Sequence, residues 1–206
     1  MKKILFLALI FPILFFIGCG SKMLSYSDHD KIKAKAERGN ADAQYKLGLL
    51  YKYFGDNDSV TESEKETIYE LAFKWYTKAA EQNYTAAWNG LGTLYEEGKG
   101  VPQDYQKAFE YYTKAAEHGS AVAKYNLAMI YFYGDGIERD YEKSIEWLTK
   151  SAEQNLAMAQ NDLGTWYYEG KIVPQDFQKA VEWWTKAAKQ GNEYAQKNLQ
   201  DIKGKK

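Results

Sequence analysis

Residues 121–156 read AVAKYNLAMIYFYGDGIERDYEKSIEWLTKSAEQNL, and residues 157–192 read AMAQNDLGTWYYEGKIVPQDFQKAVEWWTKAAKQGN. The two segments have the same length of 36 residues and align without a gap, with Trp147 opposite Trp183. The same period separates four leucines of the chain: Leu91, Leu127, Leu163 and Leu199. A period in the range of about 20–50 residues is typical of solenoid proteins, in which each repeat packs only against its neighbours.

Each repeat contains the signals for two helices joined by a turn. In residues 86–97 the apolar side chains recur at helical spacing, and Gly98 supplies a residue that tolerates the left-handed conformation at a helix end. A second helix is predicted over residues 105–118, with an aspartate before it as the N-cap. The predicted caps and stops repeat along the chain: Asp104, Asp140 and Asp176 as caps, and Asn83, Gly119, Asn155 and Gly191 as stops.

The predicted fold is therefore all-α, a right-handed α/α superhelical solenoid of about four 36-residue helix-turn-helix repeats with flanking half-repeats. Small residues follow the repeated leucine at Gly92, Ala128 and Gly164, where we expect the two helices of a repeat to approach closely. The assigned ranges are a solenoid at 29–206, repeats at 41–84, 85–120, 121–156 and 157–192, and a C-terminal capping helix at 193–202.

The first repeat is longer than the others, with 44 residues between Leu47 and Leu91. Its surplus lies in residues 54–66, where we expect a solvated loop followed by the start of a lengthened second helix. Within this range Ser63 and Glu66 have the spacing of a capping box, which predicts a helix start there and a helix end near Gln82. Asp56, Asn57 and Asp58 resemble the beginning of a calcium loop, but threonine occupies the two later positions where an EF-hand requires glycine and glutamate. No calcium site is expected.

The N-terminal segment follows a different pattern. Lys2 and Lys3 precede an uncharged apolar run over residues 4–17, which is the arrangement of a secretory signal peptide. We assign residues 1–18 to this signal and residues 19–28 to a short tether. An uncleaved N-terminal helix remains the alternative, although the run is short for a membrane span of about 17–25 residues.

Residues 16–19 read Phe-Ile-Gly-Cys, and this tetrapeptide resembles the lipobox of bacterial lipoproteins. The resemblance implies cleavage before Cys19 and a diacylglyceryl group on its sulfur, which would attach the protein to a membrane. Gly20 follows the cysteine, which by the same resemblance implies the outer membrane, facing the periplasm. Cys19 is the only cysteine, so the chain cannot form an internal disulfide. The expected location is the bacterial cell envelope.

Three longer motifs carry a second resemblance. They are Ala-x-x-x-Leu-Gly-x-x-Tyr at 87–95 and 159–167, Gly-x-Gly-Val-Pro-x-Asp-Tyr-x-Lys-Ala at 98–108, and Lys-Ala-Ala-Glu-x-Gly at 114–119. Together they resemble the Sel-like repeat, a relative of the tetratricopeptide repeat, over about residues 41–192. This resemblance implies adaptor or assembly work through protein binding. Some relatives in the cell envelope are immunity proteins that bind a secreted toxin, and this alternative stays open.

If the packing follows the tetratricopeptide relatives, the first helix of each repeat lines a concave groove that holds a protein or peptide partner. The residues expected on this surface change their chemistry between repeats. In the third repeat they form an apolar patch, where the second and fourth repeats carry Asn, Thr and Glu; alternatively, these rings pack against the neighbouring helix. The candidate partner-binding residues are Tyr45, Tyr53, Asn89, Tyr125, Met129, Phe132, Tyr133, Asn161 and Tyr168.

Signals for catalysis and for nucleic-acid binding are missing from the sequence. The formal net charge is −1, from 27 basic and 28 acidic residues, which leaves no basic excess to attract nucleic acid. His29 and His118 have no partner at metal-ligand spacing, and the sequence contains neither the G-x-S-x-G motif nor the motif set of the serine β-lactamases. We therefore expect a non-enzymatic protein without metal or cofactor, and a hydrolase such as a β-lactamase is the least favoured function.

Overall fold

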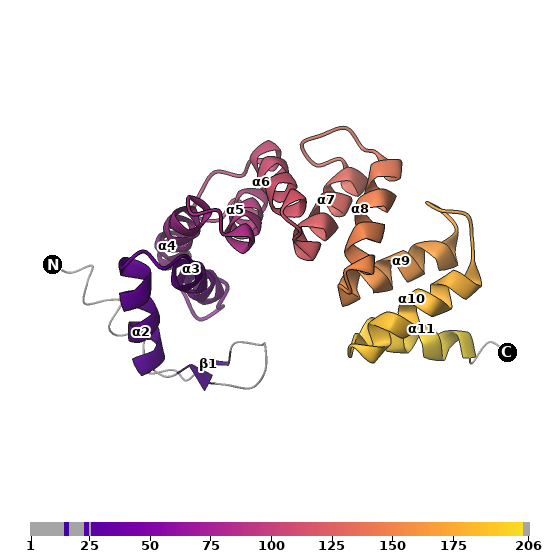
Figure 1. The fold of residues 1–206 in the computed structure, drawn as a ribbon, viewed down its shortest axis with the longest axis horizontal. Helices are drawn as coiled ribbons and strands as arrows, with labels where there is room; N and C mark the ends of the chain where they lie inside the picture. The colour runs from indigo at the N-terminus through magenta and orange to yellow at the C-terminus, as the bar shows by residue number, and fades with distance from the viewer. Residues whose placement is uncertain (1–14, 17–22, 25, 204–206) are drawn as a thin grey trace. The chain divides into compact units, whose positions relative to one another are not determined.

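A computed structural model describes residues 15–16, 23–24 and 26–203, and ten helices make up most of this part of the chain (Figure 1). Two strands of two residues each, β1 (Phe15–Phe16) and β2 (Met23–Leu24), pair in antiparallel fashion. The helices are α2 (Tyr26–Glu37), α3 (Ala41–Gly55), α4 (Glu62–Ala80), α5 (Thr85–Glu97), α6 (Tyr105–Glu117), α7 (Ala121–Tyr133), α8 (Tyr141–Glu153), α9 (Ala157–Glu169), α10 (Phe177–Lys189) and α11 (Glu193–Lys203). The predicted all-α repeat fold is confirmed.

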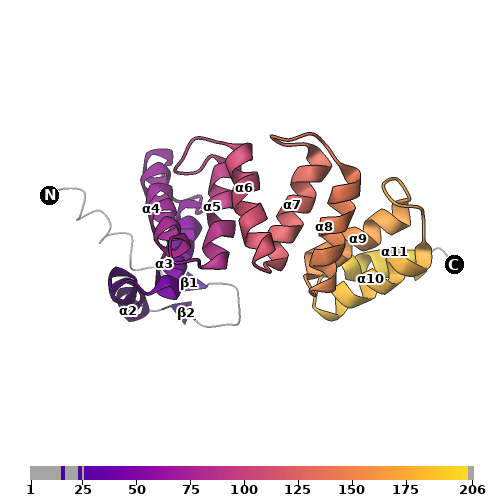
Figure 2. The same ribbon diagram turned by 45° about the horizontal axis from the view of Figure 1, so that its top comes forward.

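The chain divides into two compact units, and the boundary lies within α5, between Ala87 and Trp88. In the first unit, α3 packs against α2 and α4. In the second unit, the two helices of a repeat pack together, α7 with α8 and α9 with α10 (Figures 1 and 2). Within this unit, the second helix of one repeat also packs against the helix that follows it, as in α6 with α7, α8 with α9 and α10 with α11.

The predicted lipid attachment at Cys19 and most of the predicted signal at 1–18 lie outside the described residues, so both stay predictions. Helix α2 begins at Tyr26, within the stretch that the sequence assigns to the tether. None of the helices in the described ranges combines the length and the apolar character that crossing a bilayer requires.

The three predicted capping aspartates and the four predicted helix stops are confirmed. The carboxylate of Asp104 accepts a hydrogen bond from the backbone N–H of Lys107 at 3.0 Å, and Asp140 and Asp176 repeat this cap at 2.9 Å. At the other end of the second helices the backbone has positive φ. The values are 61° at Asn83, 90° at Gly119, 66° at Asn155 and 86° at Gly191, in the region that glycine and asparagine adopt most readily.

A lysine near the start of each second helix connects the cap to the first helix. Its ammonium group lies 3.2–3.8 Å from the capping carboxylate and 5.1–5.3 Å from the centre of a tyrosine ring in the first helix. These lysine and tyrosine pairs are Lys107 with Tyr95, Lys143 with Tyr131 and Lys179 with Tyr167. Cation–π contacts at partly exposed sites contribute about 0.5–1 kcal/mol each, so this contact supports the fold of every repeat in the second unit.

The small residue of each first helix faces a large side chain of the second helix. A Cβ atom added to Gly92 would lie 2.6 Å from the ring of Tyr112, and one added to Gly164 would lie 2.6 Å from the ring of Trp184. In the third repeat this small residue is Ala128. At the position of these two rings the third repeat has Leu148, which is buried in the same core cluster as Ala128. Alanine is therefore tolerated in the one repeat of this unit where the ring is absent.

The first repeat differs from its predicted form. Helices α3 and α4 hold 15 and 19 residues, against 13 in each of α5 and α6, and the connection between them spans only residues 56–61. The predicted lengthening of the second helix is confirmed in α4. The loop before it is shorter than predicted because Phe54 and Gly55 are buried at the end of α3. The capping box is formed by Thr61 and Glu64, whose carboxylate accepts from the Thr61 N–H at 3.0 Å, and not by Ser63 and Glu66.

We predict that Gly164→Ala destabilises the protein by about 1–3 kcal/mol, because the new methyl group overlaps the Trp184 ring. Combining it with Trp184→Leu recreates the pair that Ala128 and Leu148 form in the third repeat. The double variant should therefore be more stable than the sum of the two single changes indicates. Urea denaturation followed by circular dichroism measures all three proteins, and strictly additive losses would contradict the coupling.

Candidate partner-binding face

The first helices of the second unit, α5, α7 and α9, carry seven of the predicted binding residues. We call their common side, which includes these residues, the A-helix face. Tyr133, at the end of α7, is the most exposed of the seven, with 58% of its surface accessible. The others are partly buried: Asn89, Tyr125, Met129, Phe132, Asn161 and Tyr168.

Hydrogen bonds join the A-helix face from one repeat to the next. They connect residues 37 positions apart, so each bond crosses between successive first helices. The pairs are Asn126 to Asn89 at 3.1 Å, Tyr125 to Asp162 at 2.8 Å, and Asn198 to Asn161 at 3.3 Å. The polar groups of three predicted binding residues therefore also take part in stacking the repeats.

Asp162 is a partly buried carboxylate in this series. It accepts hydrogen bonds from the Tyr125 hydroxyl at 2.8 Å and from the Asn161 amide at 3.1 Å. Burial raises the pKa of Asp162, and these two hydrogen bonds oppose the shift only in part. Burial and the adjacent carboxylate also raise the pKa of Tyr125. Within the described part of the chain, Asp162 forms no ion pair.

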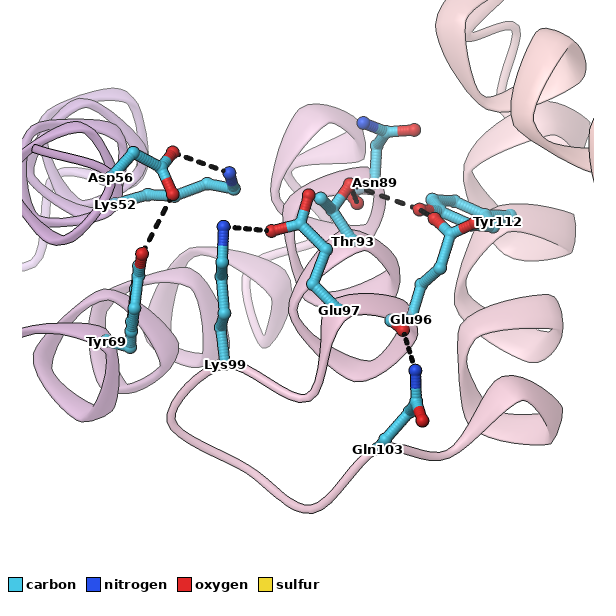
Figure 3. Close-up of polar contacts among 10 residues, drawn as sticks. All are labelled: Lys52, Asp56, Tyr69, Asn89, Thr93, Glu96, Glu97, Lys99, Gln103 and Tyr112. Atoms are coloured by element: carbon cyan, nitrogen blue, oxygen red, sulfur yellow. Dashed lines mark hydrogen bonds and ion pairs between the residues drawn. The ribbon is translucent and has the colours of Figure 1, made fainter. Parts of the chain in front are cut away.

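Glu96 is a second partly buried carboxylate, at the end of α5. Figure 3 shows it beside Tyr112, whose hydroxyl lies 2.5 Å from the Glu96 carboxylate and 3.2 Å from the Thr93 hydroxyl. Burial raises the pKa of Glu96, and the charges of Glu97 and Asp135 raise it further, while the hydrogen bond from Tyr112 lowers it. The charges that act on Glu96 are thus negative.

The predicted apolar patch of α7 separates into a packed part and an exposed part. The Phe132 ring stacks on Trp166 of α9, with centroids 5.4 Å apart and planes 22° apart. It also contacts Tyr133 at 4.9 Å and Tyr141 at 5.7 Å. Met129 packs against the core cluster that contains Leu163 and Trp166. Phe132 and Met129 therefore support the contact between repeats, whereas Tyr133 extends into solvent.

Two exposed rings next to predicted binding residues were not themselves among the predicted residues. Tyr141 and Phe177 are the first residues of α8 and α10, and they are 44% and 53% exposed. Phe177 lies 5.4 Å from the Tyr168 ring, just as Tyr141 lies near Phe132. Their 36-residue spacing was visible in the sequence. That spacing follows from the repeat itself and does not indicate exposure.

In the first unit the predicted residues are Tyr45 and Tyr53. The Tyr45 ring is packed, 5.2 Å from Tyr84 and 5.7 Å from Tyr76, and Tyr53 is 44% exposed. The carboxylate of Asp56 pairs with Lys52 at 2.9 Å and accepts from the Tyr69 hydroxyl at 2.9 Å, as Figure 3 also shows. In the ranges that the structure describes, no group of three or more His, Cys, Asp or Glu side chains could hold a metal ion.

The comparison with protein families decides the classification. The Sel1 repeat matches residues 41–84, 86–120, 121–156 and 157–192. The chain belongs to the Sel1 repeat family. The matching family is a repeat family and not a catalytic one. A comparison with curated proteins found no match.

Solved structures of Sel1 repeat proteins resemble the chain over most of its length. A Sel1 repeat protein from Oxalobacter formigenes is 32% identical with a TM-score of 0.74, covering 90% of this chain and 70% of that protein. A protective antigen of uropathogenic Escherichia coli strains, described as displaying an SLR fold, is 39% identical with a TM-score of 0.69. The match covers 83% of this chain but 35% of the antigen. Cysteine-rich protein B of Helicobacter pylori is 27% identical with a TM-score of 0.50, and the match covers 66% of this chain and 95% of that protein.

We predict that Asp162→Asn changes the pH dependence of stability. The raised pKa of Asp162 means that the folded protein binds this proton more tightly than the unfolded chain, so ionisation lowers wild-type stability as pH rises above about 4. The variant lacks this loss. Its melting temperature relative to wild type should therefore increase between about pH 4 and pH 7. Asp201→Asn, at an exposed position of α11, is the control. A difference for Asp162→Asn that is constant with pH would contradict the prediction.

Proposed function

We propose that this Sel1 repeat protein is a scaffold that binds a protein or peptide partner on the A-helix face of its second unit. We further propose that a lipid on Cys19 anchors it in the bacterial cell envelope, in the outer membrane facing the periplasm. Membership of a helical repeat family supports the first part, because such repeats expose extended surfaces that partners can cover. The lipobox-like sequence before Cys19 supports the second.

The observation that carries the binding proposal is the exposed ring of Tyr133. The equivalent residue is Glu97 in α5 and Glu169 in α9, so stacking of the repeats does not require an aromatic residue there. With 58% of its surface accessible and Tyr141 nearby at 44%, Tyr133 presents apolar surface that a partner would remove from water. Tyrosine is among the residues that contribute most to binding energy in protein interfaces.

An immunity role would use the same face to occupy a secreted toxin. The identity of a partner captured from the envelope separates the two functions, because a toxin indicates inhibition and a component of envelope assembly indicates a scaffold. Mass spectrometry of the protein captured from envelope extract therefore distinguishes inhibition from scaffolding.

Truncation of the exposed ring tests the binding face. Tyr133→Ala should weaken capture of the partner from envelope extract by at least about tenfold, since aromatic anchors in interfaces contribute about 2 kcal/mol or more. Thermal stability should barely change because the side chain is exposed. Tyr194→Ala, at a residue of α11 that is 75% exposed, is the matched control. Equal capture by Tyr133→Ala and wild type after chemical crosslinking would exclude this face.

Phe132→Ala is not a suitable substitute for this variant. Its ring stacks on Trp166 of the next repeat, so truncation would lower stability and binding together. The pairing of Tyr133→Ala with Tyr194→Ala separates a loss of binding from a loss of fold.

Replacement of the only thiol tests the anchor. The wild-type protein should remain in the membrane pellet through a high-salt wash, because several acyl chains hold a protein firmly while one chain binds only marginally. Cys19→Ser should lose lipid labelling and leave an unprocessed precursor or a soluble species. Unchanged fractionation of Cys19→Ser, together with an unlabelled wild type, would instead support an uncleaved N-terminal helix.

A further inference from the structure

Charge is distributed unevenly between the two rows of helices in the second unit. The second helices α6, α8 and α10 carry seven lysines and six glutamates, which nearly balance. The first helices α5, α7 and α9 carry four carboxylates and one lysine: Glu96, Glu97, Asp162 and Glu169 against Lys124. The A-helix face therefore has an acidic excess that the other row lacks.

Lys124 does not compensate the acids of this face. Its ammonium group donates a hydrogen bond to the side chain of Gln154, at the end of α8, at 2.8 Å. Glu97 and Glu169 each pair with a lysine two residues further along the chain, Lys99 at 2.9 Å and Lys171 at 3.2 Å. The carboxylates without an ion pair among the described residues of these three helices are therefore Glu96 and Asp162.

The fold itself does not require a carboxylate at either position. Asn126 and Asn198 are the equivalents of Asp162 in the neighbouring segments, and each makes the same kind of contact with the preceding first helix through a neutral amide. The equivalents of Glu96 are the rings of Phe132 and Tyr168. A partly buried charge that lacks an opposite charge costs desolvation energy. The two acids thus add a cost that neutral side chains avoid elsewhere in the same repeats.

In the order of the repeats, the helix that carries the exposed Tyr133 comes between the helices that carry the two acids. Glu96 belongs to α5, Tyr133 to α7 and Asp162 to α9. The connection after α7 adds Asp135, whose charge acts on Glu96. The one cation of that connection, Arg139, is held by the carbonyl of Tyr133 and the hydroxyl of Tyr141, each at 3.2 Å.

We propose that the partner of this face is a basic peptide segment, with lysine or arginine side chains on both sides of an apolar or aromatic residue. The inference rests on the proposed function and specifies the chemistry of its partner. The central residue packs against Tyr133 and Tyr141, while the basic side chains pair with Glu96 and Asp162. Charge-assisted hydrogen bonds of this kind are about twice as strong as neutral ones, and they would offset the desolvation of both carboxylates.

Other classes of ligand fit the face less well. Nucleic acids and anionic lipid surfaces carry phosphate groups, which the excess of carboxylates repels. A metal ion needs several ligands gathered at one point, and the described ranges contain no such group of His, Cys, Asp or Glu. A basic segment matches both the acids and the exposed rings.

Selection from a random linear peptide library displayed on phage, with the full-length chain in detergent as the target, tests this chemistry. The expected peptides are enriched in lysine and arginine around an apolar residue relative to the unselected library. Their binding, measured by fluorescence anisotropy, should weaken as salt is added because the attraction is between charges. Selected peptides without a positive excess, or no selected peptides at all, would overturn the proposal.

Neutral variants locate the site of binding. Glu96→Gln combined with Asp162→Asn should weaken the selected peptides at least about tenfold, a change of 1.4 kcal/mol. The matched control is Glu110→Gln combined with Glu182→Gln, which removes two exposed acids from α6 and α10 and should leave binding unchanged. Equal loss in both double variants, or no loss in the first, would contradict the assignment. Circular dichroism checks the fold, and Asp162→Asn alone provides a milder variant with the same expected direction.

The two proposals fail in different ways. If the envelope partner is lost by Tyr133→Ala but retained by Glu96→Gln with Asp162→Asn, the basic segment is wrong and the scaffold stands. If basic peptides bind as expected but Tyr133→Ala and wild type capture the same envelope proteins, the scaffold proposal fails while the preference for basic segments holds.

Discussion

Close packing between the two helices of a repeat is the constraint on which the rest of the structure depends. In the second unit, Gly92 and Gly164 lack a side chain where the rings of Tyr112 and Trp184 cover the helix backbone. In the third repeat, Ala128 and Leu148 occupy the equivalent positions and pack in the same core cluster. This contact sets how near the helices lie and therefore where the next repeat can stack. The capping aspartates and their lysines then hold each second helix in register with the first.

Because the core positions are committed to this packing, chemical variation is concentrated on the remaining positions of the first helices. There the third repeat carries an exposed Tyr133 where its neighbours carry glutamate, and Glu96 and Asp162 place charge in partly buried surroundings. Neutral residues fill the equivalent positions of other repeats, so neither acid is needed for stacking. Under the proposed function, the cost in stability of keeping such groups is recovered in the complex with the partner.

The repeats of the second unit were predictable because each decisive residue recurs. The capping aspartate recurs at Asp104, Asp140 and Asp176, so the prediction of each cap is supported by the other two. The first repeat has a different length, so the other repeats give no such support for its cap. Its extra residues extend α3 and α4, and its capping box at Thr61 lies two residues before the predicted one. Burial of Phe54 and Gly55 favours helix over loop at the end of α3. That preference depends on which residues pack against the helix, and the local sequence does not identify them.

The sequence by itself determined the helical repeat, its period, its helix ends and its membership of a repeat family, because these depend on local spacing and on residues with special backbone freedom. Only the tertiary structure decided which side chains of the A-helix face remain exposed. Phe132 and Tyr133 are adjacent in sequence, yet one stacks on Trp166 and the other extends into solvent. The same holds for Asp162, whose hydrogen bond to Tyr125 joins residues 37 positions apart. Burial is set by neighbours in space, and stacking of the repeats chooses those neighbours.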